Sequence, residues 1–229
     1  MLSEHEITRR LAQVNDRISV AARRSSRFPG AVCLVLASKT QPPDAILAAY
    51  HAGARYFGEN YVQEAMDKLT RLHDLADLRW HLIGHLQSNK VRPAASMFEL
   101  IHSLDSLRLA QALHKVHPAP PTRVLLEINL AAETSKRGIP PGDAERLIAG
   151  IRDQVEVAGL MAIPPPAPRA EHSRRYFTRL REMRDTLAAH SGLRLGELSM
   201  GMTDDFEVAI EEGATIVRVG RAVFGERPP

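Results

Sequence analysis

The segment VCLVLASKTQPPDAILAAYHAGARYFG, residues 32–58, contains a strand, a helix and a second strand in that order. Residues 32–38 form a continuous run of apolar and small residues, residues 43–52 have apolar side chains at helical spacing, and residues 54–58 again have strand character. Asp44 suits the first turn of this helix, and Gly53 suits its C-cap. A strand that is apolar along its whole length predicts a parallel sheet covered on both faces.

The same alternation continues along the chain. Further strand-like runs lie at 78–84, 97–103, 122–129, 155–161, 193–200 and 215–220, and helical spacing recurs at 60–73, 87–95, 105–116, 141–152, 169–190 and 204–212. Asp105 and Thr203 are expected at helix starts and Gly213 at a helix end. The pattern predicts an α/β fold, a (β/α)8 TIM barrel, as a single domain over residues 1–229.

Two segments fall outside this repeat. Residues 1–28 have amphipathic helical spacing and precede the first strand, so we expect an extra N-terminal helix that closes the bottom of the barrel or packs on its side. The proline-rich residues 162–170 resemble a domain linker, but strand and helix patterns resume on both sides. We therefore interpret them as the loop after the sixth strand.

Composition excludes several classes of protein. Of the 229 residues, 44% are hydrophobic and the net charge is +3, without a basic stripe interleaved with aromatic residues, so we expect no nucleic-acid binding. No apolar run is long enough to cross a bilayer, which predicts a protein that does not contact membranes. The lone cysteine, Cys33, fits a buried thiol in a reducing cytoplasm. Without an obvious apolar helix seam, we expect a monomer.

In a barrel, functional residues gather at the C-terminal ends of the strands. Lys39 stands there at the rim of an apolar interior, where low dielectric disfavours the charged ammonium. A neutral lysine attacks carbonyl carbon and forms a Schiff base. The alternative is an ordinary solvated lysine that leaves a strand.

The last two strands add a candidate anion site. Ser199 and Gly201 precede a helix, and Gly220 lets backbone approach a ligand closely. Phosphate sites after strands seven and eight recur in this fold, and strand eight neighbours strand one when the barrel closes. A ligand with both an aldehyde and a phosphate would fit, and pyridoxal 5′-phosphate (PLP) is one such ligand.

Arg218 lies two residues before Gly220 and so on the same face of its strand. If it points at a pyridine nitrogen, it would keep that nitrogen unprotonated and weaken the ring as an electron sink. The alternative is an inward barrel residue that pairs with a carboxylate such as Glu127 or Glu197.

The motifs LASKTQP, FGENYVQE, WHLIGHLQSNK, IHSLDS, GLMAIPP, LSMGMTDDFEVAI and ATIVRVGRAVFG, between residues 31 and 226, resemble the YggS/PROSC family of PLP homeostasis proteins. The resemblance implies a barrel related to the N-terminal domain of alanine racemase, with PLP bound as an internal aldimine. It places the aldimine on Lys39 and the remaining cofactor contacts on Asn60, Ser199, Met200, Arg218, Gly220 and Arg221. Because an arginine follows Gly220 here, only the backbone N–H of Arg221 is a safe phosphate contact.

The resemblance further implies a protein that buffers PLP and delivers it to apo-enzymes, without a robust reaction of its own. Racemases of the related fold use a second base from a C-terminal β domain, and this chain stops a few residues after Gly225. We therefore do not expect two-base racemisation. A weak amino-acid racemase, or a Schiff-base aldolase acting on a phosphorylated sugar acid, remains the alternative.

Other candidates are weaker. His81 and His85 lack the partners of a metal site, so we expect no metal. His102, Ser103 and Asp105 are too close in sequence for a catalytic triad, and we interpret them as a strand end and a helix cap. Lys136, in ETSKRG, is interpreted as a solvated loop lysine, although the same loop position would also suit contact with the cofactor.

Overall fold

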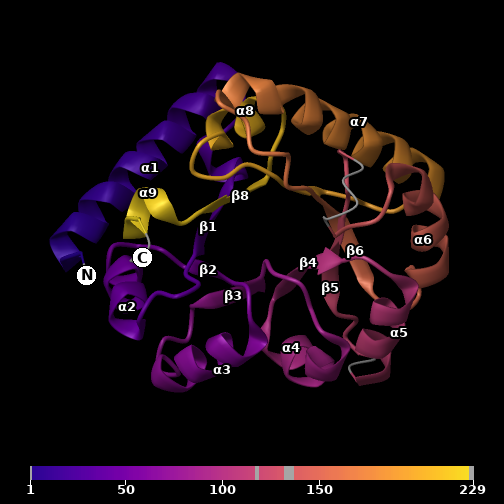
Figure 1. Ribbon diagram of the computed structural model, residues 1–229, viewed down its shortest axis with the longest axis horizontal. Coiled ribbons are helices and arrows are strands. Elements are labelled where there is room, and N and C mark those ends of the chain that lie inside the picture. The colour runs from indigo at the N-terminus through magenta and orange to yellow at the C-terminus, as the bar shows by residue number, and fades with distance from the viewer. Residues whose placement is uncertain (1, 117–118, 132–136, 227–229) are drawn as a thin grey trace.

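The computed structural model describes residues 2–116, 119–131 and 137–226. Its parallel strands pair in chain order and close into a barrel, which confirms the predicted TIM-barrel fold (Figure 1). The strands are β1 (Cys33–Ala37), β2 (Tyr56–Glu59), β3 (Arg79–Leu82), β4 (Leu100–Leu104), β5 (Arg123–Glu127), β6 (Glu156–Met161), β7 (Glu197–Ser199) and β8 (Ile216–Val219).

Helices follow the strands and surround the barrel (Figure 1). They are α2 (Pro43–His51), α3 (Val62–Arg71), α4 (Val91–Met97), α5 (Leu107–Val116), α6 (Ala144–Ile151), α7 (Arg174–Ser191) and α8 (Phe206–Glu211). Short 3-10 turns precede three of these helices, at Ser88–Lys90, Pro141–Asp143 and Ala170–Ser173. A further helix, α9 (Arg221–Phe224), was not predicted, because four residues are too few to show a helical period.

The predicted N-terminal helix is α1 (Glu4–Arg24), and a 3-10 turn at Pro29–Ala31 joins it to β1. It begins at Ser3, whose hydroxyl accepts a hydrogen bond from the backbone N–H of Glu6. Its buried face packs against α2, α8 and α9. Of the two placements expected, the helix therefore takes the one on the side of the barrel (Figure 1).

Two helix ends agree with the sequence and two starts do not. Gly53 and Gly213 follow α2 and α8 with φ of 103° and 102°, as C-cap glycines do. α5 is instead capped by Ser106, whose hydroxyl accepts from Leu109 N, so the expected cap at Asp105 was wrong. α8 begins at Phe206, later than Thr203, because the Asp205 carboxylate accepts from Met202 N and holds the preceding residues in a loop.

The seam between β1 and β8 closes the barrel. Val35 pairs with Arg218 and Leu36 with Val219, so the C-terminal ends of these two strands lie side by side. Inside the barrel, Val35, Leu100, Leu125, Ala158, Met161 and Ile216 form a separate apolar cluster. In the part of the chain that the structure describes, no helix has the length and apolar character needed to cross a membrane.

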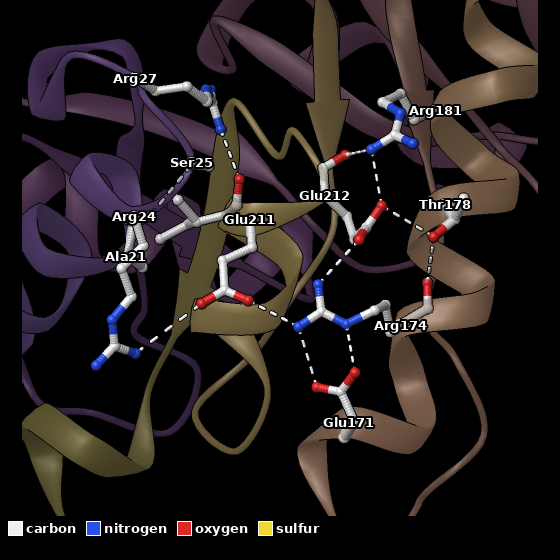
Figure 2. A network of polar contacts seen from close by, with 11 residues as sticks. Ala21, Arg24, Ser25, Arg27, Glu171, Arg174, Thr178, Arg181, Glu211 and Glu212 are labelled. Atoms are coloured by element: carbon white, nitrogen blue, oxygen red, sulfur yellow. Dashed lines mark hydrogen bonds and ion pairs between the residues drawn. The ribbon is translucent and has the colours of Figure 1, made fainter.

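An ion-pair network holds α8 between α1 and α7 (Figure 2). Arg174 of α7 contacts Glu211 at 2.7 Å and Glu212 at 2.9 Å, and Arg181 contacts Glu212 at 2.7 Å. Arg24 of α1 reaches Glu211 at 4.0 Å. The network fixes the helix that directly follows the loop after β7.

Candidate functional site

A cavity of about 470 Å³ opens at the C-terminal ends of the strands. Its lining includes Lys39, Asn60, Arg218, Gly220 and Arg221, which were all predicted as site residues. A larger cavity, of about 1120 Å³, lies at the opposite end of the barrel beside Cys33 and Tyr56. We take the smaller cavity as the candidate site, because functional groups of this fold gather at the C-terminal ends of the strands.

Lys39 follows β1 in a tight turn and lines this cavity. Before it, Ser38 is fully buried and its N–H donates to Gly58 O at 2.9 Å. After it, Thr40 has φ of 65°, a left-handed conformation that is uncommon for a residue other than glycine. The turn directs the chain from β1 toward α2 and leaves Lys39 at the cavity wall.

Asn60, which follows β2, reaches the cavity because Gly84 leaves room for its backbone. A Cβ atom on Gly84 would lie only 2.4 Å from Asn60 O. The two strand ends thus approach more closely than any side chain at residue 84 would allow.

Arg218 points into the barrel and is 5% exposed. Its guanidinium donates to Ser199 Oγ, and to Ala162 O at 3.1 Å. Burial lowers the pKa of Arg218 to about 10, so the group stays charged at neutral pH. The sequence left open a direct pair with Glu127 or Glu197. The hydrogen bonds of Arg218 go to a hydroxyl and a carbonyl, and Glu197 accepts from Thr215. The charge of Glu127 nevertheless raises the pKa of Arg218, against the larger effect of burial.

Behind Arg218, a chain of hydrogen bonds continues through the barrel interior. Ser199 Oγ lies 2.9 Å from His102 Nδ1, and His102 Nε2 lies 3.0 Å from His81 Nδ1. Because Arg218 donates to Ser199, the serine proton is left to donate to His102, which then donates to His81. Burial lowers the pKa of His81 to about 4 and that of His102 well below its usual range, so both rings are neutral.

These hydrogen bonds correct the interpretation of two histidines. His102 was predicted to mark a strand end, and His81 was considered only as a metal ligand. Both instead point into the barrel and take part in the hydrogen bonds that continue from Ser199. The signal in the sequence was a histidine within each of two consecutive buried strands. Which strand face each ring occupies follows only from the register of β3 against β4.

Ser199 and Met200, the other two predicted site residues, lie beneath the cavity. The Ser199 hydroxyl is fully buried between Arg218 and His102. Met200 is also fully buried, and its backbone N–H donates to Ile216 O at 3.1 Å. The structure therefore connects Ser199 to the cavity through Arg218, and places Met200 in the core.

Gly220 and α9 form the end of the cavity that suits an anion. A Cβ atom on Gly220 would lie 3.1 Å from Ala37 O, so glycine lets the end of β8 approach the end of β1. α9 starts at the next residue, and the first N–H groups of a helix have no partner within it. The Arg221 side chain pairs with Asp204 and lies 3.5 Å from Glu226, which leaves its backbone N–H as the group for a ligand.

His85 and Cys33 are not among the residues that line the cavity. His85 Nδ1 lies 3.6 Å from Asp105 Oδ2, and the described residues include no group of three or more metal-ligating side chains. Cys33, expected as a buried thiol, is only half-buried at the opposite end of the barrel, where desolvation raises the pKa of its thiol to about 12. Lys136 lies outside the described residues.

Lys68 was not singled out from the sequence. It is almost completely buried below the turn that carries Lys39, together with Glu59. The available signal was the spacing of Glu64 and Lys68, four residues apart on one helix face.

Comparisons with known proteins give a consistent result. The family described as "Alanine racemase, N-terminal domain" matches residues 10–228. A "Pyridoxal phosphate homeostasis protein" of Pseudomonas aeruginosa is 45% identical over 225 residues, which cover 96% of each chain. The protein of the same name from Escherichia coli K12 is 43% identical over 234 residues, covering 97% of each chain.

Solved structures agree. PipY of Synechococcus elongatus PCC7942 with PLP bound superposes with a TM-score of 0.84 at 39% identity, covering 96% of this chain and 100% of PipY. Alanine racemase of Corynebacterium glutamicum has a TM-score of 0.69 at 19% identity, over 94% of this chain and 61% of the racemase. The second likeness shows the shared barrel fold alone.

Proposed function

Because the chain belongs to the family of pyridoxal phosphate homeostasis proteins, we propose that it binds PLP in the cavity at the C-terminal end of the barrel. Lys39 would hold the cofactor through a reversible Schiff base, in which the amine nitrogen adds to the aldehyde carbon and one water is released. The observation that carries this proposal is that Lys39, Arg218 and Gly220 line one cavity, from the first and last strands.

The residues present fit this cofactor. The cavity volume, about 470 Å³, falls within the range of small-molecule sites. Its donors are an amine at Lys39, a charged guanidinium at Arg218, and backbone N–H groups at the start of α9. When bound, the cofactor supplies an aldehyde and an aromatic ring that withdraws electrons.

Arg218 decides how much of that electron withdrawal is available. It is charged and fixed by Ser199 and Ala162 O. It would donate a hydrogen bond to a ring nitrogen placed against it, and a charged guanidinium would not accept a proton from that nitrogen. An unprotonated pyridine nitrogen is a weak electron sink. We propose that the site retains PLP and has little power to stabilise a carbanion.

The lining also favours a carrier over a racemase. No tyrosine, histidine or cysteine is among the described residues that line the cavity, and its two carboxylates, Asp204 and Glu226, both pair with Arg221. Two-base racemisation requires a second acid–base group opposite the lysine, which leaves only slow exchange through Lys39 itself as the racemase alternative. We propose that the protein acts in the cytoplasm as a monomeric PLP carrier, and that apo-enzymes that use PLP receive the cofactor from it.

The visible spectrum of purified protein tests the linkage. We expect a Schiff-base band in the wild type and in Lys90→Ala, and its loss in Lys39→Ala without unfolding, because a residue at the cavity rim contributes little to the core. Lys90 is a suitable control, since its amine contacts Gln63 at 3.3 Å on the surface. Borohydride reduction followed by mass spectrometry should place the adduct on Lys39, and an adduct on another lysine would contradict the proposal.

A second set of measurements separates carrier from enzyme. The carrier predicts yellow protein, negligible exchange of the α-proton of added amino acids in deuterated water, and transfer of PLP to a recipient apo-enzyme. Rapid α-proton exchange would indicate a racemase. Colourless protein that cleaves a phosphorylated sugar acid would indicate an aldolase.

A further inference from the structure

The ammonium of Lys68 lies directly beneath the turn that carries Lys39. Lys68 belongs to the last turn of α3 and is 5% exposed. Its Nζ atom donates to three oxygens, each at 2.7 Å: Ser38 O, Glu59 Oε1 and Glu64 Oε1. An ammonium has three donors, so Lys68 has used all of them to join β1, β2 and α3.

The same acceptors hold the chain on both sides of Lys39. On the N-terminal side, the Ser38 carbonyl accepts from Lys68, and the Ser38 hydroxyl donates to Glu59 Oε1 at 2.6 Å. On the C-terminal side, the N–H of Thr40 donates to Glu64 Oε1 at 2.5 Å. Through these contacts one ammonium fixes the peptide groups before and after Lys39.

Burying the charged groups of this network costs free energy, so stability alone does not explain it. Glu59 is fully buried, and burial raises the pKa of its carboxyl despite the hydrogen bonds from Lys68 and Ser38. Buried ion pairs rarely stabilise a protein more than well-packed apolar residues of the same volume. The turn also holds Thr40 at a positive φ, a conformation that persists only where its surroundings impose it. Both features suit a network that sets the conformation of the turn.

We propose that Lys68 is a positioning residue that holds the backbone of Lys39 so that its amine faces the cavity. This inference rests on the proposed function, in which Lys39 forms the Schiff base. Glu59 and Glu64 transmit the effect, the first through Ser38 and the second through Thr40.

The test compares two ligands that differ only at the reacting group. PLP carries an aldehyde, whereas pyridoxine 5′-phosphate carries a hydroxymethyl group in its place and forms no Schiff base. Lys68→Met removes the ammonium and keeps an unbranched side chain. We expect this change to weaken PLP binding about tenfold or more, the usual effect of losing a hydrogen bond to a charged group. Binding of pyridoxine 5′-phosphate should stay within about twofold, because its contacts do not involve the amine.

Further variants make the result decisive. Glu64→Ala removes the acceptor of the Thr40 N–H at a position where the side chain is 26% exposed, so it should fold even if Lys68→Met does not. It should weaken PLP selectively, by a smaller factor. Leu113→Ala, in the buried face of α5, opens a cavity in the core away from this turn and should leave the affinities for both ligands unchanged.

The outcomes separate this inference from the proposed function. If Lys39→Ala abolishes the preference for PLP over pyridoxine 5′-phosphate while Lys68→Met and Glu64→Ala leave it intact, Lys68 does not position Lys39. Equal weakening of both ligands by Lys68→Met likewise overturns the inference, since it indicates general damage to the site. If Lys39→Ala keeps the preference for PLP, the Schiff-base assignment is wrong and the role of Lys68 falls with it.

Discussion

Gly201, in the loop between β7 and α8, combines two constraints that a substitution series can separate. Its φ is 91°, and a Cβ atom there would lie 2.5 Å from Ala209 Cβ and 2.9 Å from Phe206 Cα. For Gly201→Ala, left-handed backbone strain costs about 1–2 kcal/mol. Forcing an extra methyl into a packed site costs about 1–3 kcal/mol more. We expect the free energy of unfolding to fall by about 2–5 kcal/mol.

Three other glycines supply the controls. Gly53 has φ of 103°, and a Cβ atom there would have no neighbour within 4 Å, so Gly53→Ala should lose only the strain, about 1–2 kcal/mol. Gly159 has no positive φ, but its Cβ would lie 1.9 Å from Glu197 O, so Gly159→Ala isolates the steric clash. Gly142 has neither constraint, and Gly142→Ala should be neutral or should stabilise by up to about 1 kcal/mol.

Urea unfolding near neutral pH measures these differences, provided that the dependence of free energy on denaturant stays the same among the variants. The loss in free energy of unfolding should be smallest for Gly142→Ala, larger for Gly53→Ala and largest for Gly201→Ala. A loss for Gly201→Ala no greater than that for Gly53→Ala would show that Ala209 and Phe206 yield to the new methyl group. The packing argument for the loop after β7 would then be wrong.

Two further predictions concern a partly buried charge and a titrating histidine. Glu212→Ala removes the acceptor shared by Arg174 and Arg181 and should lower the free energy of unfolding by about 2 kcal/mol. Glu145→Ala, at the exposed pair with His190, should change it by less than about 1 kcal/mol. Equal losses of both variants in urea unfolding would contradict this difference. Burial lowers the pKa of His81 from 6.5 to about 4, so between these pH values the unfolded chain binds a proton that the native state does not. The contribution of His81 to the free energy of unfolding is therefore unaffected above pH 6.5 and becomes more unfavourable as the pH drops toward 4. His81→Gln should flatten this dependence across urea titrations at several pH values, and an unchanged slope would show that other groups cause it.

The barrel could be predicted because each strand and helix carries its own periodic signal. The run at residues 32–38 contains only apolar and small residues, as suits a strand between two layers. The glycines after α2 and α8 mark helix ends that the structure confirms. The ends of elements were harder to place. The strand expected over 193–200 is only Glu197–Ser199, and α8 starts two residues late because one aspartate side chain organises the loop before it.

The site was partly predictable for a related reason. Lys39 and Asn60 follow strands and Arg218 lies near the end of one, so fold and position in the sequence suffice to bring them to one end of the barrel. The roles of buried partners depend on register and depth, which sequence spacing does not give. The side chain of Ser199 points toward Arg218, and the side chain of Lys68 points inward beneath Lys39. Sequence spacing predicts neither direction.

The pairing of β1 with β8 has a consequence for how the protein matures. Lys39 is synthesised before Arg218 and Gly220, because β1 comes first and β8 last in the chain order of the barrel strands. Until β8 docks against β1, the Lys39 amine and the backbone at Gly220, which we propose binds the phosphate, are not held together. On the proposed function, retention of PLP would thus report that β8 has paired with β1 and closed the barrel. A chain that lacks β8 would lack part of the proposed binding site.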